Sequence, residues 1–555
     1  MRRIEKKKSF VARVIQRNEK EWISLELVAQ LRCRILLIWY MKLISSFNER
    51  LGTGKGLLLF LLGLNLVWLG GYYLIDFIYT DEWTRYLRQL YFSRFTLIIA
   101  LLCLISASIQ HFKNFISDTE KTATDLSIFR ILFFVFFAIG LIFNPSIVSD
   151  QVLPFLDLPD SARVSLPFMG WYPKVVPINE TLVNIALILF YISIFTSLFG
   201  IKTRWSIVIF TLTLFYLFAI PNLYGKVNHN HHLIWFPAIL AFSPCADRFS
   251  LDAYFRKRTG KPIHHPSSSY SLPFLLIWTL LGLIYFFPGF WKMWSNGLDW
   301  CLTDNVRNQM YYKWFQLGDS ISWTPFFRID QYPILFKASG IYTVIFELSF
   351  IPLFLNKTTR KIAIALGIGF HLGTLFFMHI FFIVLVWSYL SFVNWSKIKF
   401  LKEREILTSQ ISSDKSVLVV KWIGVVLIST SIIFGFGKLY SWPFTAYPTF
   451  DVIVQEETDH LIYVATTRNG QEIELSNAPL YLEYTSPRYW NIEHNIIQSS
   501  HKNKLDSAFM DHLVSIYESK SKMITEVNIY IENQSIIPEE RNDAPRKLIY
   551  SKECH

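Results

Sequence analysis

Three histidines within four residues, His229, His231 and His232, come directly before an apolar stretch in the segment GKVNHNHHLIWFPAILAF. Two of them have a spacing that suits zinc or copper, but the same loop supplies no cysteine or carboxylate to complete a metal site. A single histidine at the mouth of an apolar pocket would instead suit general acid or base catalysis. We favour a site without a metal ion.

Lys292 lies at the end of another apolar stretch, in YFFPGFWKMWSN. Its neighbours Phe290, Trp291 and Trp294 would surround the amine with apolar surface, and such surroundings favour the neutral amine that a general base requires. The alternative is that the side chain extends along apolar surface to reach the lipid headgroups.

Glu347 and His371 also lie inside apolar stretches, in GIYTVIFELSFIPLF and GIGFHLGTLFF. Ionisable residues at such positions are costly and often functional, so both are candidates to support the site. Each residue also has a structural alternative. Glu347 could be a protonated group that donates a hydrogen bond, and His371 could be a residue that packs between helices. If Lys292 is a base, we expect Glu347 to be protonated or to lie several residues' depth away, because an adjacent carboxylate favours the charged amine.

The composition predicts a multi-pass membrane protein, with 52% hydrophobic residues, 17% aromatic residues and a mean hydropathy of +0.32. Apolar stretches near the length needed to cross a bilayer, about 20 residues, recur along the chain. We predict about eleven spans, at 57–78, 95–108, 126–143, 182–200, 205–220, 233–246, 272–290, 334–355, 362–377, 380–393 and 417–436.

The distribution of lysine and arginine predicts the orientation of these spans. Basic residues gather at 2–20, 32–42, 202–204, 248–261, 357–361 and 397–404, and cytoplasmic loops carry such an excess. Eleven spans place all of these clusters on the cytoplasmic side of the cell (inner) membrane, with the C-terminus on the outer side. The net charge of +12 is then a signal of topology, and we expect no nucleic acid partner.

The chain divides into four predicted parts: a basic amphipathic cytoplasmic segment at 1–55, two extra spans at 56–122, an all-α membrane domain at 123–440 and a small extracytoplasmic α+β domain at 441–555. In the last part, alternating strands flank Asn469-Gly470, which predicts a type I′ hairpin. A helix near 504–519 and a strand near 526–532 follow. Cys301 and Cys554, the two cysteines expected on the outer side, either pair or remain free.

Several motifs resemble the horizontally transferred transmembrane (HTTM) domain family, which includes bacterial relatives of vitamin K-dependent gamma-glutamyl carboxylase. They are GKVNHNHHL, LAFSPCADRFSLDA, YFFPGFWKM with GLDW, and GFHLGTLFF. ATDLSIFRILFFVFFAIG resembles the first span of that domain, and SWPFTAYPTF resembles the exit from its last. The resemblance covers about 123–450, and the two spans before it have no counterpart.

The resemblance implies a set of roles for residues of this chain. Lys292 would be the base that deprotonates reduced vitamin K or another quinol, with O2 and CO2 as co-substrates. Asn228-His229 matches the motif whose histidine assists, so we expect His229 to act and His231 and His232 to be interfacial polar residues. Asp252, in Ser250-Leu251-Asp252, matches a further motif and would support the site, which the resemblance implies opens outward.

Two functions follow from the resemblance. The first is a lyase of the gamma-glutamyl carboxylase type, with membrane lipids, a lipid-soluble quinone and a protein or peptide substrate on the outer face as partners. The second is a non-carboxylating family member that binds a quinone or lipid, or modifies an envelope lipid. The chain departs from the carboxylase in having Trp291-Lys292 in place of a lysine pair, and about 110 residues in place of a large lumenal region.

Overall fold

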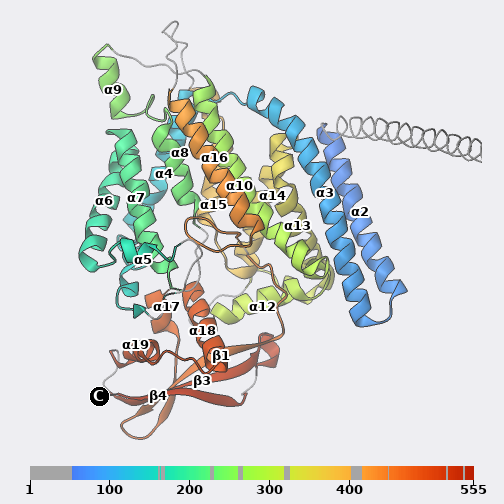
Figure 1. The fold of residues 1–555 in the computed structure, drawn as a ribbon, viewed down its shortest axis with the longest axis vertical. Coiled ribbons are helices and arrows are strands. Elements are labelled where there is room, and N and C mark those ends of the chain that lie inside the picture. Colours follow the sequence, from blue (N-terminus) through green and yellow to red (C-terminus); the bar gives the residue numbers. More distant parts are fainter. Residues whose placement is uncertain are drawn as a thin grey trace, which may run out of the picture.

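The computed structural model describes residues 53–160, 163, 169–224, 230–260, 267–317, 325–401, 415–447, 449–484, 486–519, 523–541 and 544–554. They form a bundle of apolar helices with a small domain of strands and helices at one end (Figure 1). Almost all of the predicted basic segment at 1–55 lies outside the described residues, as do Asn228 and His229.

In the described part of the chain, nine helices are long and apolar enough to cross a membrane. The chain is therefore a multi-pass membrane protein with a mostly helical fold, as predicted. The nine helices are α2 Gly54–Ile78, α3 Glu82–Asp118, α4 Ala123–Phe143, α6 Glu180–Phe199, α7 Thr203–Asn222, α10 Ser267–Asn296, α13 Pro333–Leu355, α14 Arg360–Met378 and α16 Lys415–Phe436.

The predicted count of about eleven spans is not confirmed, because two of the predicted spans are short helices. The first is α8 His232–Phe242, and the second is α15 Ile383–Ser388 continued by η5 Tyr389–Phe392. At about 1.5 Å per residue, such helices cover about half of the hydrocarbon core. Pro244 helps to end α8, since a proline disfavours the helical conformation of the residue before it, and Ser243 is extended with ψ 163°.

One end of the bundle, which we call the α9 end after α9 Leu251–Arg258, contains the described basic loops. Here Nζ of Lys121 donates to the carbonyl of Val393 at 2.8 Å, and Asp125 accepts from the backbone N–H of Ser396 in η6 Trp395–Lys397 at 3.1 Å. Arg248 before α9 donates to the carbonyl of Leu401, and Asp252 of α9 accepts from the N–H of Thr203 at 2.7 Å. Together these contacts bring the loops before α4, after α6, around α9 and after η5 to one side of the bundle, as the charge pattern predicts.

The opposite end, the α12 end, contains the longer loops and the C-terminal domain (Figure 1). Arg488 of that domain donates to the carbonyl of Pro221 at 2.6 Å, and Nε1 of Trp490 donates to the carbonyl of Gln316 at 3.2 Å. The short elements at this end are η1 Leu153–Phe155, α5 Tyr172–Val175, α11 Asp299–Leu302, α12 Asn305–Leu317 and η4 Ile329–Gln331.

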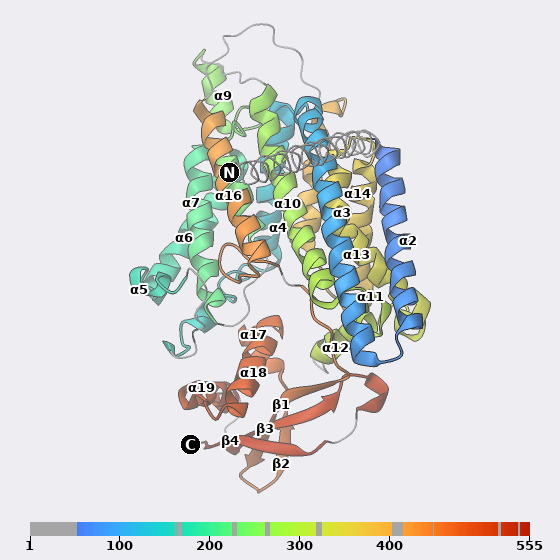
Figure 2. The ribbon, with the colours of Figure 1, turned by 45° about the vertical axis from the view of Figure 1, so that its right-hand side comes forward.

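The C-terminal domain is an antiparallel sheet of order β2-β1-β3-β4, with helices on the side that faces the bundle (Figure 2). Leu461, Tyr463 and Ala465 alternate inward along β1 and form the core with β3 and the helices. The elements are β1 Glu457–Thr467, β2 Glu472–Leu475, α17 Ala478–Tyr484, α18 Ser486–His501, α19 Ser507–Glu518, β3 Ile524–Ser535, η7 Pro538–Glu540 and β4 Arg546–Glu553. The predicted small α+β domain is present.

The predicted hairpin is present, but its turn is not type I′. Gly470 has a positive φ of 79° and its N–H donates to the carbonyl of Thr467 at 2.8 Å, whereas Asn469 is not in the left-handed region. A type I′ turn needs positive φ at both central residues, so this is the longer turn in which only the glycine is left-handed. Cys301 and Cys554 are free thiols, so the disulfide alternative is wrong.

Orientation in the membrane is the first testable prediction. In a variant without the five native cysteines, Gln471→Cys in the hairpin should react with a membrane-impermeant maleimide in intact cells. Arg258→Cys on α9 should react only after the cells are permeabilised. Both positions are exposed, so the difference reports sidedness. Labelling of position 258 but not 471 in intact cells would contradict the predicted topology.

Candidate functional site

A cavity of about 390 Å³ lies between α10, α13 and α14, near the α12 end of the bundle. Its wall is largely apolar. Lys292 of α10, Glu347 of α13 and His371 of α14 all line it, so the structure brings together three of the predicted site residues. Each is at least 97% buried, and none of the three reaches the surface.

Lys292 and Glu347 form a buried ion pair. Nζ of Lys292 donates to both carboxylate oxygens of Glu347, at 2.6 and 2.8 Å, and lies 5.0 Å from the centre of the Trp300 ring. The side chain of Lys292 is 2% exposed, so the alternative in which it extends to the headgroups is wrong. Of the two alternatives for Glu347, the one in which it lies away from the amine is also wrong, and the one in which it is protonated remains a prediction.

A glycine permits this contact between two helices. A Cβ atom at Gly289 would lie 2.7 Å from Cβ of Glu347 and 3.3 Å from Oε2, closer than a side chain there allows. Pro288, also inside α10, supplies no N–H to the helix. The Pro288-Gly289 pair before Lys292 therefore brings α10 close to α13, and the amine meets the carboxylate.

His371 belongs to a second polar group in the same wall. The Tyr285 hydroxyl and Nε2 of His371 share a hydrogen bond of 2.8 Å, and the Tyr389 hydroxyl donates to Tyr285 at 3.1 Å. Nδ1 of His371 is buried without a hydrogen-bond partner in the described part of the chain. Tyr285 and Tyr389 were not predicted from the sequence, although a tyrosine hydroxyl inside an apolar span is a signal of a buried polar contact.

The segment after α16 covers the cavity at the α12 end, where Tyr447, Thr449 and Phe450 line it. Nε1 of Trp300 donates to the carbonyl of Phe450 at 2.6 Å, which fixes the indole above Lys292. Burial raises the pKa of the Tyr447 hydroxyl well above its ordinary value, so this phenol stays neutral. Burial also raises the pKa of the Cys301 thiol, beside Trp300, to about 12 and leaves it unreactive.

His231 and His232 lie behind this cover and not at an interface. Both are at most 1% exposed. The ring of His231 packs against Trp442 and Tyr447, with centroids 5.0 and 5.2 Å apart. The expectation that they are interfacial polar residues is therefore wrong. The predicted role of His229 remains a prediction, because Asn228 and His229 lie outside the described residues.

The two N-terminal spans, α2 and α3, contact the end of α10 and the start of α11 beside the same site. The Tyr72 hydroxyl of α2 donates to Asp299 at 2.6 Å, and Nε of Arg94 in α3 donates to the carbonyl of Trp294 at 2.8 Å. Burial raises the pKa of Asp299, an effect that the bond from Tyr72 opposes. These contacts hold the end of α10 and the start of α11, where Lys292 and Trp300 lie.

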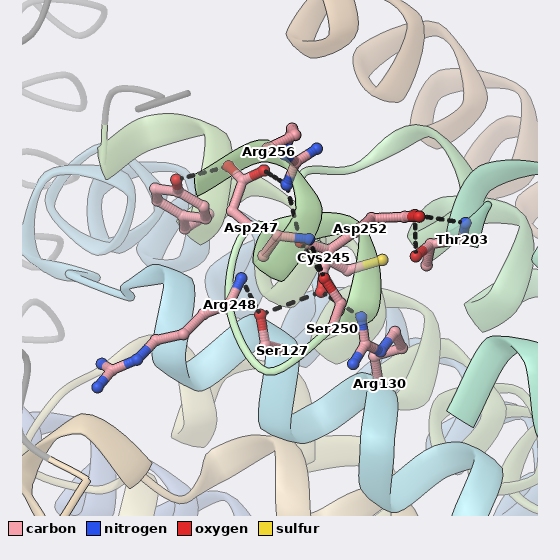
Figure 3. A network of polar contacts seen from close by, with 12 residues as sticks. Ser127, Arg130, Thr203, Cys245, Asp247, Arg248, Ser250, Asp252 and Arg256 are labelled. Carbon is pink, nitrogen blue, oxygen red and sulfur yellow. Dashed lines mark hydrogen bonds and ion pairs between the residues drawn. The ribbon is translucent and has the colours of Figure 1, made fainter. Parts of the chain in front are cut away.

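Asp252 lies at the α9 end, beside Thr203 (Figure 3). It is not among the residues that line the cavity. Its carboxylate accepts from the backbone N–H groups of Lys202 and Thr203, at 2.9 and 2.7 Å, and from the Thr203 hydroxyl at 2.7 Å. These groups begin α7, so Asp252 satisfies helix N–H groups that have no partner within the helix. The structure therefore gives Asp252 a structural role, in place of its expected support of the site.

The rest of the SPCADRFSLDA motif is equally structural. Arg130 of α4, fully buried, donates to the carbonyls of Cys245 and Phe249 at 3.2 and 2.6 Å. Asp247 accepts from Arg256 at 3.0 Å. Figure 3 shows how these contacts tie α4, α7 and the loop before α9 together. The described residues contain no group of three or more His, Cys, Asp or Glu side chains that could hold a metal ion.

Comparison with known proteins gives one match. The model of the HTTM domain family matches residues 119–396. This range contains the ion pair, His371 and the Arg130 and Asp252 contacts, and it ends before the C-terminal domain. No curated protein and no solved structure matches the chain.

The structural role of Asp252 gives a second prediction. Asp252→Ala should lower the free energy of unfolding by about 1 kcal/mol, because the first N–H groups of α7 lose their acceptor. A thermal unfolding curve of the purified protein measures this. Lys257→Ala, on the exposed side of α9, is the matched control and should change the curve little. Loss of ligand binding in Asp252→Ala at unchanged thermal stability would instead return Asp252 to the functional site.

Proposed function

Since the chain belongs to the HTTM domain family, we propose that it is a membrane enzyme that removes a proton from a lipid-soluble quinol, as the first step of a carboxylation. Its resemblance to the gamma-glutamyl carboxylase supports this reaction type. The single observation that carries the proposal is the Lys292–Glu347 pair, buried in the wall of an apolar cavity.

The cavity suits the ring of a quinol. Its volume of about 390 Å³ falls within the range of ligand pockets, about 300–1,000 Å³. A quinol ring is flat and apolar with two opposed hydroxyl groups. One hydroxyl would meet Lys292, and the unpartnered Nδ1 of His371 would be available to the other. With O2, the quinol would supply the strong base that prepares a carbon atom for the addition of CO2.

Glu347 has a defined part in this proposal. An ammonium ion cannot accept a proton, so Lys292 must first become neutral. Both hydrogen bonds of Nζ to Glu347 provide a route for its proton to the carboxylate. The transfer replaces two buried charges by two neutral groups, so the cost of burying charge does not oppose it. The neutral amine then takes the proton of the quinol hydroxyl, and the resulting ammonium lies beside the quinol anion.

The surrounding side chains exclude water from this transfer. Trp300 covers the amine on one side, and Tyr447 and Phe450 close the α12 end of the cavity. A low-polarity site strengthens the attraction between the ammonium and the anion, and it protects a strong base from quenching by water.

Substitution of Lys292 tests the proposal. Purified protein supplied with reduced vitamin K, O2 and radiolabelled bicarbonate should consume the quinol and incorporate the label into protein. Lys292→Ala should lower quinol consumption by at least about 100-fold, the usual contribution of a general base. Lys292→Arg should be equally inactive, because a guanidinium does not release its proton. Lys337→Ala, at a lysine of α13 that does not line the cavity, is the matched control.

The other outcomes are informative. Full activity of Lys292→Arg would show that the position needs only a positive charge, and the proton-transfer mechanism would be rejected. Binding of the quinol without its consumption would favour the non-carboxylating alternative. Quinol consumption without incorporated label would retain the proton transfer and reject carboxylation.

Glu347→Gln gives a separate prediction about the pair. The amide keeps the size of the side chain but cannot take the proton of Lys292, so quinol consumption should fall as in Lys292→Ala. The variant also leaves a buried ammonium without its counter-ion, which destabilises the fold by about 3–5 kcal/mol. The thermal unfolding curve of the variant therefore accompanies the activity measurement. A folded and fully active Glu347→Gln would show that the carboxylate does not hold the proton.

A further inference from the structure

The most exposed part of the cavity wall lies on two neighbouring helices, α13 and α14. Of the residues that line it in the described chain, the two that are exposed are Ala338 of α13 and Gly369 of α14. The lining residues of α10 are buried. The cavity therefore reaches the surface between α13 and α14, at a place that we call the α13–α14 seam, lined by Ala338, Ser339, Gly369 and Gly373.

Small side chains keep this seam open. Gly373 lines the cavity, and a Cβ atom added there would meet no atom within 4 Å. Across the seam, Ala338 and Ser339 present only small groups. On the side nearer the α9 end, Tyr342 of α13 donates a hydrogen bond to the carbonyl of Leu366 in α14 and closes the seam there. The opening therefore lies between Tyr342 and the α12 end.

The rim of the seam is apolar and lies in two helices long enough to span the membrane. Ile334 and Leu335, one helical turn from Ala338, are 83% and 43% exposed. Leu372 and Phe376, one turn from Gly369 and Gly373, are 45% and 48% exposed. Large apolar side chains exposed on a membrane span face lipid. The seam therefore opens toward the bilayer interior and not toward water.

We propose that the α13–α14 seam is a lateral entrance and tail site for a membrane-dissolved amphiphile with one flexible hydrocarbon tail. The polar head reaches the Lys292–Glu347 pair and the tail lies in the seam, with its far end in the bilayer half near the α12 end. The cavity is at the lower end of the ligand-pocket range, so it accepts a head and leaves a long tail outside. This inference rests on the proposed function for the identity of the head, a quinol, while the path depends on geometry alone.

A filled seam tests the path. Gly373→Phe places a ring where there is open space, so the fold should remain intact. The variant, in lipid nanodiscs, should bind a quinone with a polyprenyl tail at least tenfold more weakly than the unchanged protein. A quinone of the same ring without a tail should bind within about twofold. Gly70→Phe is the matched control, because Gly70 of α2 also has open space around its Cβ position.

Photocrosslinking locates the tail independently of turnover. A quinone with a diazirine near the middle of its tail should label peptides that contain 334–342 and 368–377. A fatty alcohol with the same diazirine should label them more weakly. Label mainly on the segment 441–450, or equal losses of both quinones in Gly373→Phe, would overturn the lateral path. Seam labelling by a quinone that the protein does not consume would retain the path and reject the proposed catalysis.

Discussion

A buried ion pair between α10 and α13 is the constraint on which the site depends. Charges cost several kcal/mol each to remove from water, and the cost is recovered only when the geometry is close and complete. Both hydrogen bonds from Lys292 to Glu347 are short, and the Trp300 ring supplies a further favourable contact for the ammonium. That closeness requires the absence of a side chain at Gly289. The absence of a side chain at Gly289 thus lets the amine of α10 meet the carboxylate of α13 in the wall of the cavity.

The motifs that resemble those of the HTTM family divide into two physical roles at opposite ends of the bundle. PGFWK positions the ion pair, whereas SPCADRFSLDA holds helices together through backbone acceptors and a helix cap. Arg130 and Asp252 are charged and partly or fully buried, which in sequence looks like a catalytic signature. Their partners are backbone carbonyl and amide groups of neighbouring loops. Both side chains therefore serve as hydrogen-bonding partners for backbone groups and not as reactive groups. These contacts lie outside the cavity, so they add no charged side chain to its largely apolar wall.

The sequence predicts those features that depend on composition and local pattern. It does not predict contacts between residues that are far apart in the chain. Hydropathy predicts the long spans, and the Asn469-Gly470 pattern predicts a hairpin, because both signals are local. Lys292 stands out as a charge among aromatic residues. Its contact with Glu347, 55 residues further along the chain, has no local signal, and neither has the link of His371 to Tyr285. Asp252 was assigned to the site because its motif resembles one of the family, whereas its contacts lie at the start of α7. The predicted span at 233–246 is longer than α8, which ends at Phe242, because hydropathy does not register the helix end beside Pro244.

The N-terminal hairpin of α2 and α3 lies outside the range that the family model matches, yet it contacts the candidate site. The family match begins at residue 119, after both helices. The hairpin nevertheless contacts the loop beside the ion pair, through Tyr72 to Asp299 and Arg94 to Trp294. Gly297, with a positive φ of 60°, lies against Ser93 and lets α3 approach closely. Because Trp300 follows Asp299 directly, the hairpin restrains the indole that covers Lys292. The contacts of α2 and α3 therefore hold the end of α10 and the start of α11 in position, and with them the indole beside Lys292.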